Sequence, residues 1–337
     1  MTEIDPSALV LSLGVAGVFL AAVVIAVWWI DRYDREPWPV VLLVFLWGLL
    51  VAPALVTLVG FIMDGGSSFF AANGVRPLVE ETAKGLGILL VIVFSRHFDN
   101  PTDGLVYGTA VGLGFAMTEN LLYGFSVAPA LAQGDALSLI LGRTVFTAGV
   151  HALASSTVGA GLGFGRTSGG RLRTVSWALL GLGVAVVLHG GWNLAVVNMP
   201  TDGAAWVFPT MILVPLYLTF ILSFALMLWA EHRILVKQLT EEVALGVVPP
   251  WVGRVIPYYR RRVKRDWWPS RQERIVISRL LTRLAFRKHA LAARGHSATI
   301  EGLEVVRLRA TIQGILGKPV NPGNTDEPPE SGTNTEE

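Results

Sequence analysis

An uninterrupted apolar stretch near the start of the chain, Leu9–Ile30, constrains the fold most strongly because it carries no charged residue. A helix needs about 20 such residues to cross the hydrocarbon core of a bilayer. The residues before this stretch include Glu3 and Asp5 but no lysine or arginine. A cleaved signal peptide begins with basic residues, so the sequence predicts a membrane anchor here.

Further apolar stretches follow, and 52% of the residues are hydrophobic while only 15% are charged. A soluble domain carries about a quarter charged residues, so this composition excludes a water-soluble globule, and it also excludes a disordered chain. We predict an all-α, polytopic transmembrane helical bundle with about seven spans in one domain, residues 1–230. The predicted spans cover residues 9–30, 40–63, 77–94, 104–125, 137–164, 175–197 and 206–230.

Basic residues predict the orientation of these spans. Six arginines lie in the loops at 31–37, 95–103 and 165–174, whereas the N-terminus and the alternate loops carry only Arg76. Short cytoplasmic loops are enriched in lysine and arginine. We therefore expect a multi-pass protein of the cell membrane, with the N-terminus outside and the C-terminus in the cytoplasm.

The part after the last span is basic, since 18 of the 27 lysines and arginines follow Ala230. Residues 231–318 are predicted to form a partly helical cytoplasmic extension, and residues 319–337, with five acids and no base, a disordered tail. One predicted helix has an arginine stripe and an aliphatic stripe: Arg279, Arg283 and Arg287, and Ile277, Leu280, Leu281 and Leu284. Such a helix suits an anionic lipid surface. The alternatives are a cytoplasmic protein partner or charges that only set the topology, and no motif indicates nucleic acid binding.

Glycines at four-residue spacing predict close contacts between helices. They are Gly104, Gly108 and Gly112 in one span, and Gly159 and Gly163 in another. This spacing lets helices approach closely in lipid, so we assign these glycines a packing role and no chemistry.

Ionisable residues inside the predicted spans are the candidates for function, because a charge at mid-bilayer costs about 2.5–3.5 kcal/mol even on the lenient insertion scale. They are Glu80, Glu81, Lys84, Glu119, His151 and His189, accompanied by Asn120, Arg143 and Asn193. With the predicted orientation, Glu80, Glu119, His189 and Asn193 fall in the outer half of the bilayer, and His151 lies near its middle. Four spans would thus contribute to one polar layer.

Spacing along each helix predicts the partners of these charges. Glu80 and Glu81 point about 100° apart, so one can face a cavity while the other is held by Lys84. The i, i+4 spacing favours Glu80 as the partner of this lysine. Glu119 has no basic neighbour on its own helix, so its partner must come from another element. Arg143, near the outer end of its span, could pair with one of the glutamates, and we favour the alternative that it extends toward the lipid headgroups.

Two neutral imidazoles with a carboxylate are a donor set typical of zinc, and a further carboxylate could act as general base for a water molecule. Without a metal, the same groups could still activate water, with His189 and Asn193 stabilising an oxyanion. The chain has no cysteine, no His-Glu-x-x-His and no Gly-x-Ser-x-Gly motif, which excludes thiolate, zincin and serine-elbow sites. Buried Glu and His residues also form proton relays, so a proton- or cation-coupled transporter is the alternative, and a catalytically silent scaffold is a third possibility.

Four motifs occur in a fixed order along the predicted spans. They are Glu80-Glu81-x-x-Lys84, Gly114-Phe115-x-x-x-Glu119-Asn120-x-x-Tyr123, His151 followed by small residues, and His189-x-x-x-Asn193. As a set they resemble the PrsW family of intramembrane metalloproteases, which is distantly similar to the CAAX-prenyl protease and bacteriocin-processing group. The resemblance covers roughly residues 40–230.

This resemblance implies a multi-spanning peptidase that cuts membrane proteins, in some members an anti-sigma factor. The implied catalytic residues are Glu80, Glu81 and Asn193, and the implied metal ligands are His151, His189 and Glu119. The related prenyl-protease group has a histidine where this chain has Glu119, so a zinc-assisted mechanism and a metal-free, glutamate-activated water both stay open. The expected substrate is a single-span membrane protein that is cut near the outer face.

Overall fold

The computed structural model describes residues 6–63, 74–95, 97–126, 133–168, 170–198, 207–264, 267–268, 270–294 and 299–317. All regular secondary structure in these ranges is helical, which confirms the predicted all-α class. The tail at 319–337, predicted to be disordered, lies outside the described residues. The chain divides into two compact units, Met1–Glu231 with Ala292–Ser297, and His232–Leu291 with Ala298–Glu337.

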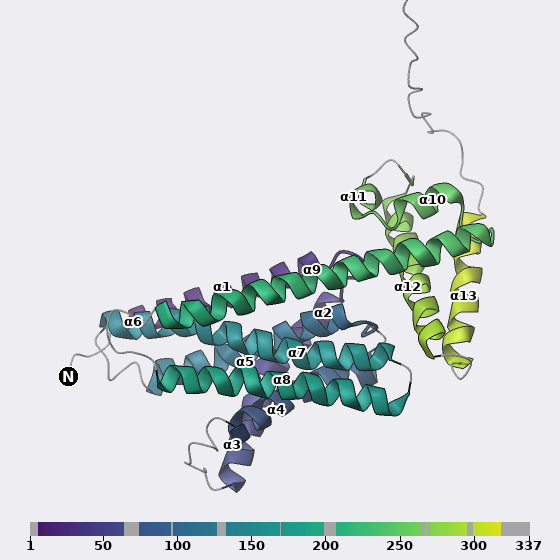
Figure 1. The fold of residues 1–337 in the computed structure, drawn as a ribbon. Helices are drawn as coiled ribbons and strands as arrows, with labels where there is room; N and C mark the ends of the chain where they lie inside the picture. Colours follow the sequence, from purple (N-terminus) through teal and green to yellow (C-terminus); the bar gives the residue numbers. More distant parts are fainter. Residues whose placement is uncertain are drawn as a thin grey trace, which may run out of the picture. The chain divides into compact units, whose positions relative to one another are not determined.

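The helices of the first unit carry the predicted polar residues and are labelled in Figure 1. They are α1 (Pro6–Ile30), α2 (Trp38–Leu46), α3 (Ala52–Ile62), α4 (Arg76–Phe94), α5 (Pro101–Ser126), α6 (Gln133–Gly142), α7 (Ala148–Thr167), α8 (Arg171–Val197) and most of α9 (Val207–Ala244). Two π-helical segments, η1 (Trp47–Val51) and η4 (Arg143–Thr147), join α2 to α3 and α6 to α7.

Five helical stretches among the described residues are long and apolar enough to cross a membrane: Val10–Ile30, Trp38–Ile62, Leu137–Thr167, Arg171–Val197 and Thr210–Ala244. The two other predicted spans are α4 and α5, which are helices of 19 and 26 residues but are not among these five. Their composition has a structural reason. α4 carries charged side chains of the polar cluster, and α5 is buried without interruption from Thr102 to Ala116, so it needs no apolar surface facing lipid.

α5 is the central helix of the first unit. It packs against α1, α2 and α7, and α7 in turn packs against α8. The side chain of Asn100 accepts hydrogen bonds from the backbone N–H groups of Thr102 (2.7 Å) and Asp103 (3.1 Å), while Asp103 accepts one from the N–H of Asn100 (2.9 Å). This capping box starts the helix three residues before the predicted span at 104, because polar capping residues do not register as part of an apolar stretch.

The second span bends where the sequence places Pro53. The π-helical segment η1 ends two residues before this proline, and α3 runs at an angle to α5, α7 and α8 (Figure 1) while it packs against α4. A proline lacks the N–H that would continue the helical hydrogen bonding, and a π-helical turn absorbs the mismatch. The indole N–H of Trp47 in η1 donates to the backbone oxygen of Ala83 at 2.9 Å, which ties the bend to α4.

The predicted packing of the glycines is confirmed at the contact of α5 with α7. A Cβ atom on Gly108 would collide with the backbone of Ser155 and Ser156, and one on Gly112 with the backbone of His151 and Ala152. The two helices therefore touch through their backbones, and this contact places His151 beside α5.

Replacing one of these glycines should loosen that contact. We expect Gly112→Ala to lower the melting temperature in detergent, because overpacking a tight contact costs about 1–3 kcal/mol and the clash is with backbone that cannot rotate away. Gly183→Ala in α8 is the matched control, since no atom lies within 4 Å of a Cβ built there. Equal melting temperatures for the two variants would contradict the close contact.

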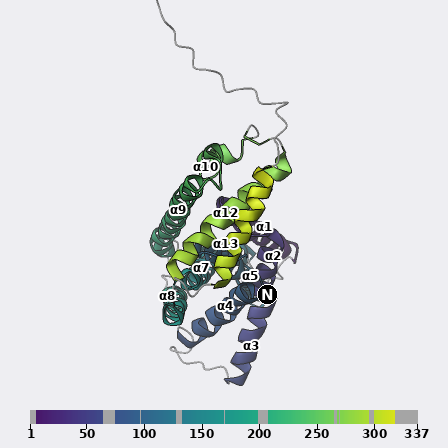
Figure 2. The same ribbon diagram turned by 90° about the vertical axis from the view of Figure 1, so that its right-hand side faces the viewer.

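The second unit has a helical core of its own. It contains the end of α9 with α10 (Pro250–Val255), α11 (Tyr259–Arg262), most of α12 (Arg271–Arg294) and α13 (Thr299–Leu316). α12 and α13 lie side by side (Figure 2). The aliphatic stripe predicted on residues 277–284 faces this core, because Ile277, Leu281 and Leu284 are fully buried in one cluster with residues of α9, α10 and α13.

Candidate active site

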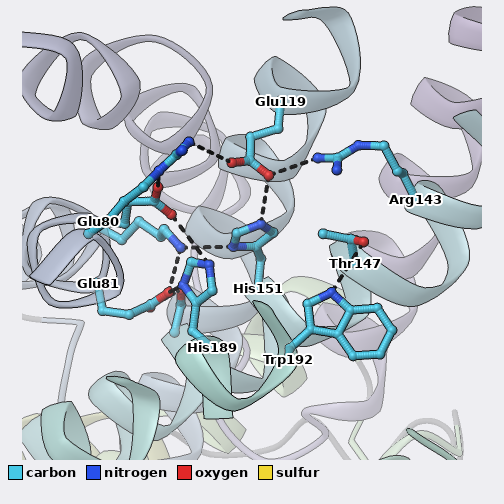
Figure 3. Close-up of polar contacts among 11 residues, drawn as sticks. Glu80, Glu81, Glu119, Arg143, Thr147, His151, His189 and Trp192 are labelled. Atoms are coloured by element: carbon cyan, nitrogen blue, oxygen red, sulfur yellow. Dashed lines mark hydrogen bonds and ion pairs between the residues drawn. The ribbon is translucent and has the colours of Figure 1, made fainter. Parts of the chain in front are cut away.

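The structure brings the predicted polar residues together from four helices of the first unit (Figure 3). α4 contributes Glu80, Glu81 and Lys84, whereas α5 contributes Glu119, α7 His151 and α8 His189. Apart from Glu119, these side chains are almost completely buried, the most accessible being His189 with 3% of its surface exposed. Separate weak signals in the sequence thus converge on one cluster.

One carboxylate oxygen of Glu80 accepts a hydrogen bond, and the other receives none from any described residue. Its Oε1 accepts a hydrogen bond from Nε of Arg76 at 2.8 Å. Its Oε2 is buried and receives no hydrogen bond from any described residue, and it lies 3.4 Å from Nε2 of His189. A buried carboxylate oxygen without a donor is costly, so this oxygen marks a place where a cation, a proton or a water molecule would be stabilised.

Glu81 is fully engaged by three partners. Its Oε1 lies 2.6 Å from Nζ of Lys84 and 2.8 Å from Nδ1 of His189, and its Oε2 accepts a hydrogen bond from the hydroxyl of Ser155 at 2.9 Å. The predicted pairing of Glu80 with Lys84 is therefore wrong. Glu81 lies on the side of α4 that faces α7 and α8, where the lysine also points, and Glu80 pairs backward with Arg76 instead.

The hydrogen bonds define the proton position on His151. An ammonium group can only donate, so Nδ1 of His151 accepts from Lys84 (3.0 Å) and Nε2–H donates to Oε2 of Glu119 (3.0 Å). His189 donates its Nδ1–H to Glu81, and its Nε2 faces Oε2 of Glu80. The two rings lie 4.6 Å apart at 83°.

Glu119 finds its partners on other elements, as predicted. Besides His151, it binds Nη2 of Arg143 at 2.9 Å, and the guanidinium of this arginine lies over the ring of Tyr123 at 3.6 Å. The expectation that Arg143 extends to the headgroups is therefore wrong. Arg143 is the first residue of the π-helical segment η4, and a half-buried glutamate compensates its charge better than a lipid-facing position would.

Segment η4 also supports the surroundings of the cluster. Thr144 accepts a hydrogen bond from the buried Asn120 at 3.0 Å, and Thr147 accepts one from the indole of Trp192 at 3.3 Å. Asn193, the next residue, is half-buried and makes no hydrogen bond with any part of the chain that the structure describes. Its side chain thus stays outside the hydrogen-bonded cluster.

Two members of the cluster, Arg76 and Ser155, were not among the predicted site residues. Both had a signal in the sequence, because Arg76 precedes Glu80 by four residues and Ser155 follows His151 by four, so each shares a helix face with its neighbour.

The charges of the cluster balance one another, and its members differ in how far they are exposed. Three carboxylates, Glu80, Glu81 and Glu119, face three bases, Arg76, Lys84 and Arg143, so these six side chains balance one another. The exposed rim lies at Arg76, whose side chain is 61% exposed, and Glu119, at 16%. An apolar cavity of about 370 Å³ between α5, α7, α8 and α9 is lined by none of these charged residues.

One group of described residues has the geometry to hold a metal ion. Ligand atoms of Glu80, His151 and His189 lie within 4.8 Å of one another, and all three residues are buried. The group contains Glu80 where the resemblance implied Glu119 as the carboxylate ligand. Two imidazoles and one carboxylate are the donor set of many catalytic zinc sites, so the residues fit such an ion.

Comparison with known proteins identifies the family. Residues 36–223 match the PrsW family intramembrane metalloproteases. The chain belongs to this family. It is therefore an intramembrane peptidase that acts on a protein substrate, which favours the protease over the transporter alternative.

The curated PrsW relatives support this assignment at moderate identity. Protease PrsW of Bacillus subtilis (strain 168) is 33% identical over 168 residues, which cover 48% of this chain and 72% of the relative. Protease PrsW of Clostridioides difficile (strain 630) is 28% identical over 185 residues, or 51% and 76% of the two chains. No solved structure matches the chain significantly. The PrsW match ends at residue 223, so the second unit lies outside it.

Proposed function

We propose that this protein hydrolyses a peptide bond of a single-span membrane protein, using water activated by a glutamate at the cluster of α4, α5, α7 and α8. The observation that carries the proposal is the buried Oε2 of Glu80, which receives no hydrogen bond and lies 3.4 Å from Nε2 of His189. A buried carboxylate oxygen without a donor is stabilised by a positive species beside it. A peptidase site supplies one as a metal ion or as a proton taken from water.

Zinc is the metal that we propose, held by Glu80, His151 and His189. When bound, it supplies Lewis acidity that polarises a carbonyl and acidifies water. Glu81 then orients His189, since a carboxylate on the second ring nitrogen fixes the tautomer of a ligating histidine. Lys84 lies at Nδ1 of His151, so we expect this lysine to shift when the metal binds.

The remaining groups can carry out the acid–base chemistry. Glu119, at the exposed rim, is the proposed general base: it accepts a proton from water as the water oxygen attacks the scissile carbonyl carbon, and it returns the proton to the amide nitrogen as the C–N bond breaks. Asn193, one helical turn beyond His189, has amide donors available for the carbonyl oxygen. In the metal-free alternative, Glu80 Oε2 is the base and the imidazoles polarise the carbonyl.

We further propose seven spans in residues 1–230, with the N-terminus outside and residues 231–318 in the cytoplasm. The balance of arginines between alternate loops supports this orientation. It would place the exposed rim, which follows the loop that ends at Arg76, toward the outer face, where the substrate would be cut. An anti-sigma factor as the substrate stays a prediction from the family resemblance.

Metal content tests this proposal. We expect about one zinc per chain in the purified, detergent-solubilised protein, and its loss in His151→Ala/His189→Ala, because three protein ligands are the usual minimum for a catalytic zinc site. The matched control is His97→Ala/His289→Ala, which removes two histidines outside the cluster. Cleavage by a wild-type protein that contains no metal would contradict the zinc assignment and support Glu80 as the base.

A further inference from the structure

We infer that the second unit binds anionic lipid headgroups through the surface of α10, α11 and the two residues after α11, and not through α12. This basic aromatic surface consists of Trp251, Arg254, Tyr258, Arg260, Arg261, Val263 and Lys264. α10 and α11 contact each other at one end of the unit (Figure 1). The inference is independent of the chemistry proposed for the cluster in the first unit.

Two arginines of the predicted stripe on α12 are already engaged by an acidic residue of the same unit. Arg283 and Arg287 both bind Glu304 of α13, at 2.8 and 3.2 Å. Lys288 and Arg309 both bind the buried Glu242, at 2.6 and 2.7 Å. Ion pairs within the unit thus compensate these charges, and the apolar face of α12 is occupied by the core. The aliphatic face of α12, which the sequence suggests for a membrane surface, instead packs in the core of the unit.

The charges of the basic aromatic surface have no such compensation. No acidic residue occurs between residues 249 and 265. Arg254, Arg260 and Lys264 are exposed and form no ion pair with any described acid. Arg261 is also exposed, and its guanidinium lies over the ring of Tyr258 at 4.7 Å. These cations form a local positive field whose natural partner carries negative charge.

Aromatic and aliphatic side chains lie among these cations. Trp251, Tyr258 and Val263 are 45%, 43% and 52% exposed. The ring of Trp251 stacks on the buried Trp268 with the centroids 5.9 Å apart, so its exposed part is held rigidly. Tryptophan and tyrosine prefer the headgroup region, where an apolar ring and a polar edge are both satisfied.

Anionic lipid satisfies both requirements at once. Basic residues bind acidic headgroups electrostatically, while interfacial aromatics insert between them. The chain also tethers this unit to the bilayer through α9, which contains the membrane-span candidate Thr210–Ala244, so little translational entropy is lost on binding.

Hydrogen–deuterium exchange of the full chain in lipid nanodiscs tests the inference. The nanodiscs contain either phosphatidylcholine alone or phosphatidylcholine mixed with phosphatidylglycerol. We expect amides of residues 250–263 to exchange about tenfold more slowly with phosphatidylglycerol present, and this protection to disappear at high salt because salt screens exposed charges. Equal exchange in both lipids would overturn the inference and point to a protein partner.

Two charge variants make the test specific. Arg254→Gln/Arg260→Gln/Arg261→Gln/Lys264→Gln should abolish the lipid-dependent protection. The matched control, Lys237→Gln/Arg271→Gln/Arg279→Gln/Arg307→Gln, removes the same number of exposed charges elsewhere in the unit and should keep it. Unchanged exchange in the buried part of α12 reports that each variant is folded. If both variants lost the lipid-dependent protection equally, net charge alone would account for it, and a defined lipid-binding surface would be contradicted.

Discussion

Glu80→Gln should reduce cleavage of a membrane-protein substrate by about 10³-fold or more while the protein stays folded. Removing a general base costs about 10²–10⁴-fold, and an amide is also a poor metal ligand, so either proposed role of Glu80 predicts a loss of this size. Glutamine can keep the hydrogen bond with Arg76, and the buried Oε2 has no described donor to lose. The measurement is the initial rate of cleavage in reconstituted liposomes, with the melting temperature measured in parallel.

Arg76→Gln serves as the control for this variant. It removes the ion pair with Glu80 but keeps the carboxylate, and its side chain is largely exposed, so we expect at most a modest loss of rate. A Glu80→Gln variant that cleaves at the wild-type rate would remove Glu80 from both proposed roles and leave Glu119 as the principal candidate among the carboxylates.

Glu81→Gln should lower both the stability of the protein and its rate of cleavage. Lys84 is fully buried and has its ion pair with Glu81 at 2.6 Å, so neutralising the glutamate leaves a buried ammonium without its counter-ion. Breaking a buried pair from one side costs about 3–5 kcal/mol. We expect a correspondingly lower free energy of unfolding in detergent for Glu81→Gln and for Lys84→Met, measured by denaturant titration.

The double variant Glu81→Gln/Lys84→Met distinguishes the loss of this ion pair from a general destabilisation of the fold. Since it removes both charges, it should regain part of the stability that each single variant loses. It should not regain cleavage, because His189 then lacks the carboxylate that orients its ring. Strictly additive losses of stability would show that the two side chains do not stabilise each other.

Helix class and most helix positions were predictable because an apolar environment imposes long uncharged stretches that are visible in the sequence. α5 shows the limit of that reasoning. A helix enclosed by other helices contacts neither lipid nor water along much of its length, so its composition reflects packing rather than hydropathy. Its capping residues and the close contact at Gly112 indicate its structural role better than its average polarity does.

Glu80, Glu81, Lys84, Glu119, His151 and His189 could be picked out as one cluster because ionisable residues inside spans are rare, whereas Arg76 and Ser155 could not. The pairing within the cluster was not predictable. Lys84 is close to both glutamates along the helix, and only the positions of α7 and α8 decide that Glu81 faces it. The inward direction of Arg143 likewise depends on the π-helical segment, which arises from tertiary packing and has no signature in a single sequence.

The pairing within α4 has a consequence for how the protein enters the membrane. Arg76 with Glu80 and Lys84 with Glu81 are pairs between residues of the same helix, so α4 is electrically neutral before it meets any other helix. The membrane-insertion machinery can thus release α4 into lipid before another helix pairs with it. Glu119 and Arg143 belong to different helices, so each is an uncompensated charge until both have been inserted. Biogenesis should therefore pause at α5 until η4 emerges, and assembly of the site would be the event that commits the nascent chain to its final fold.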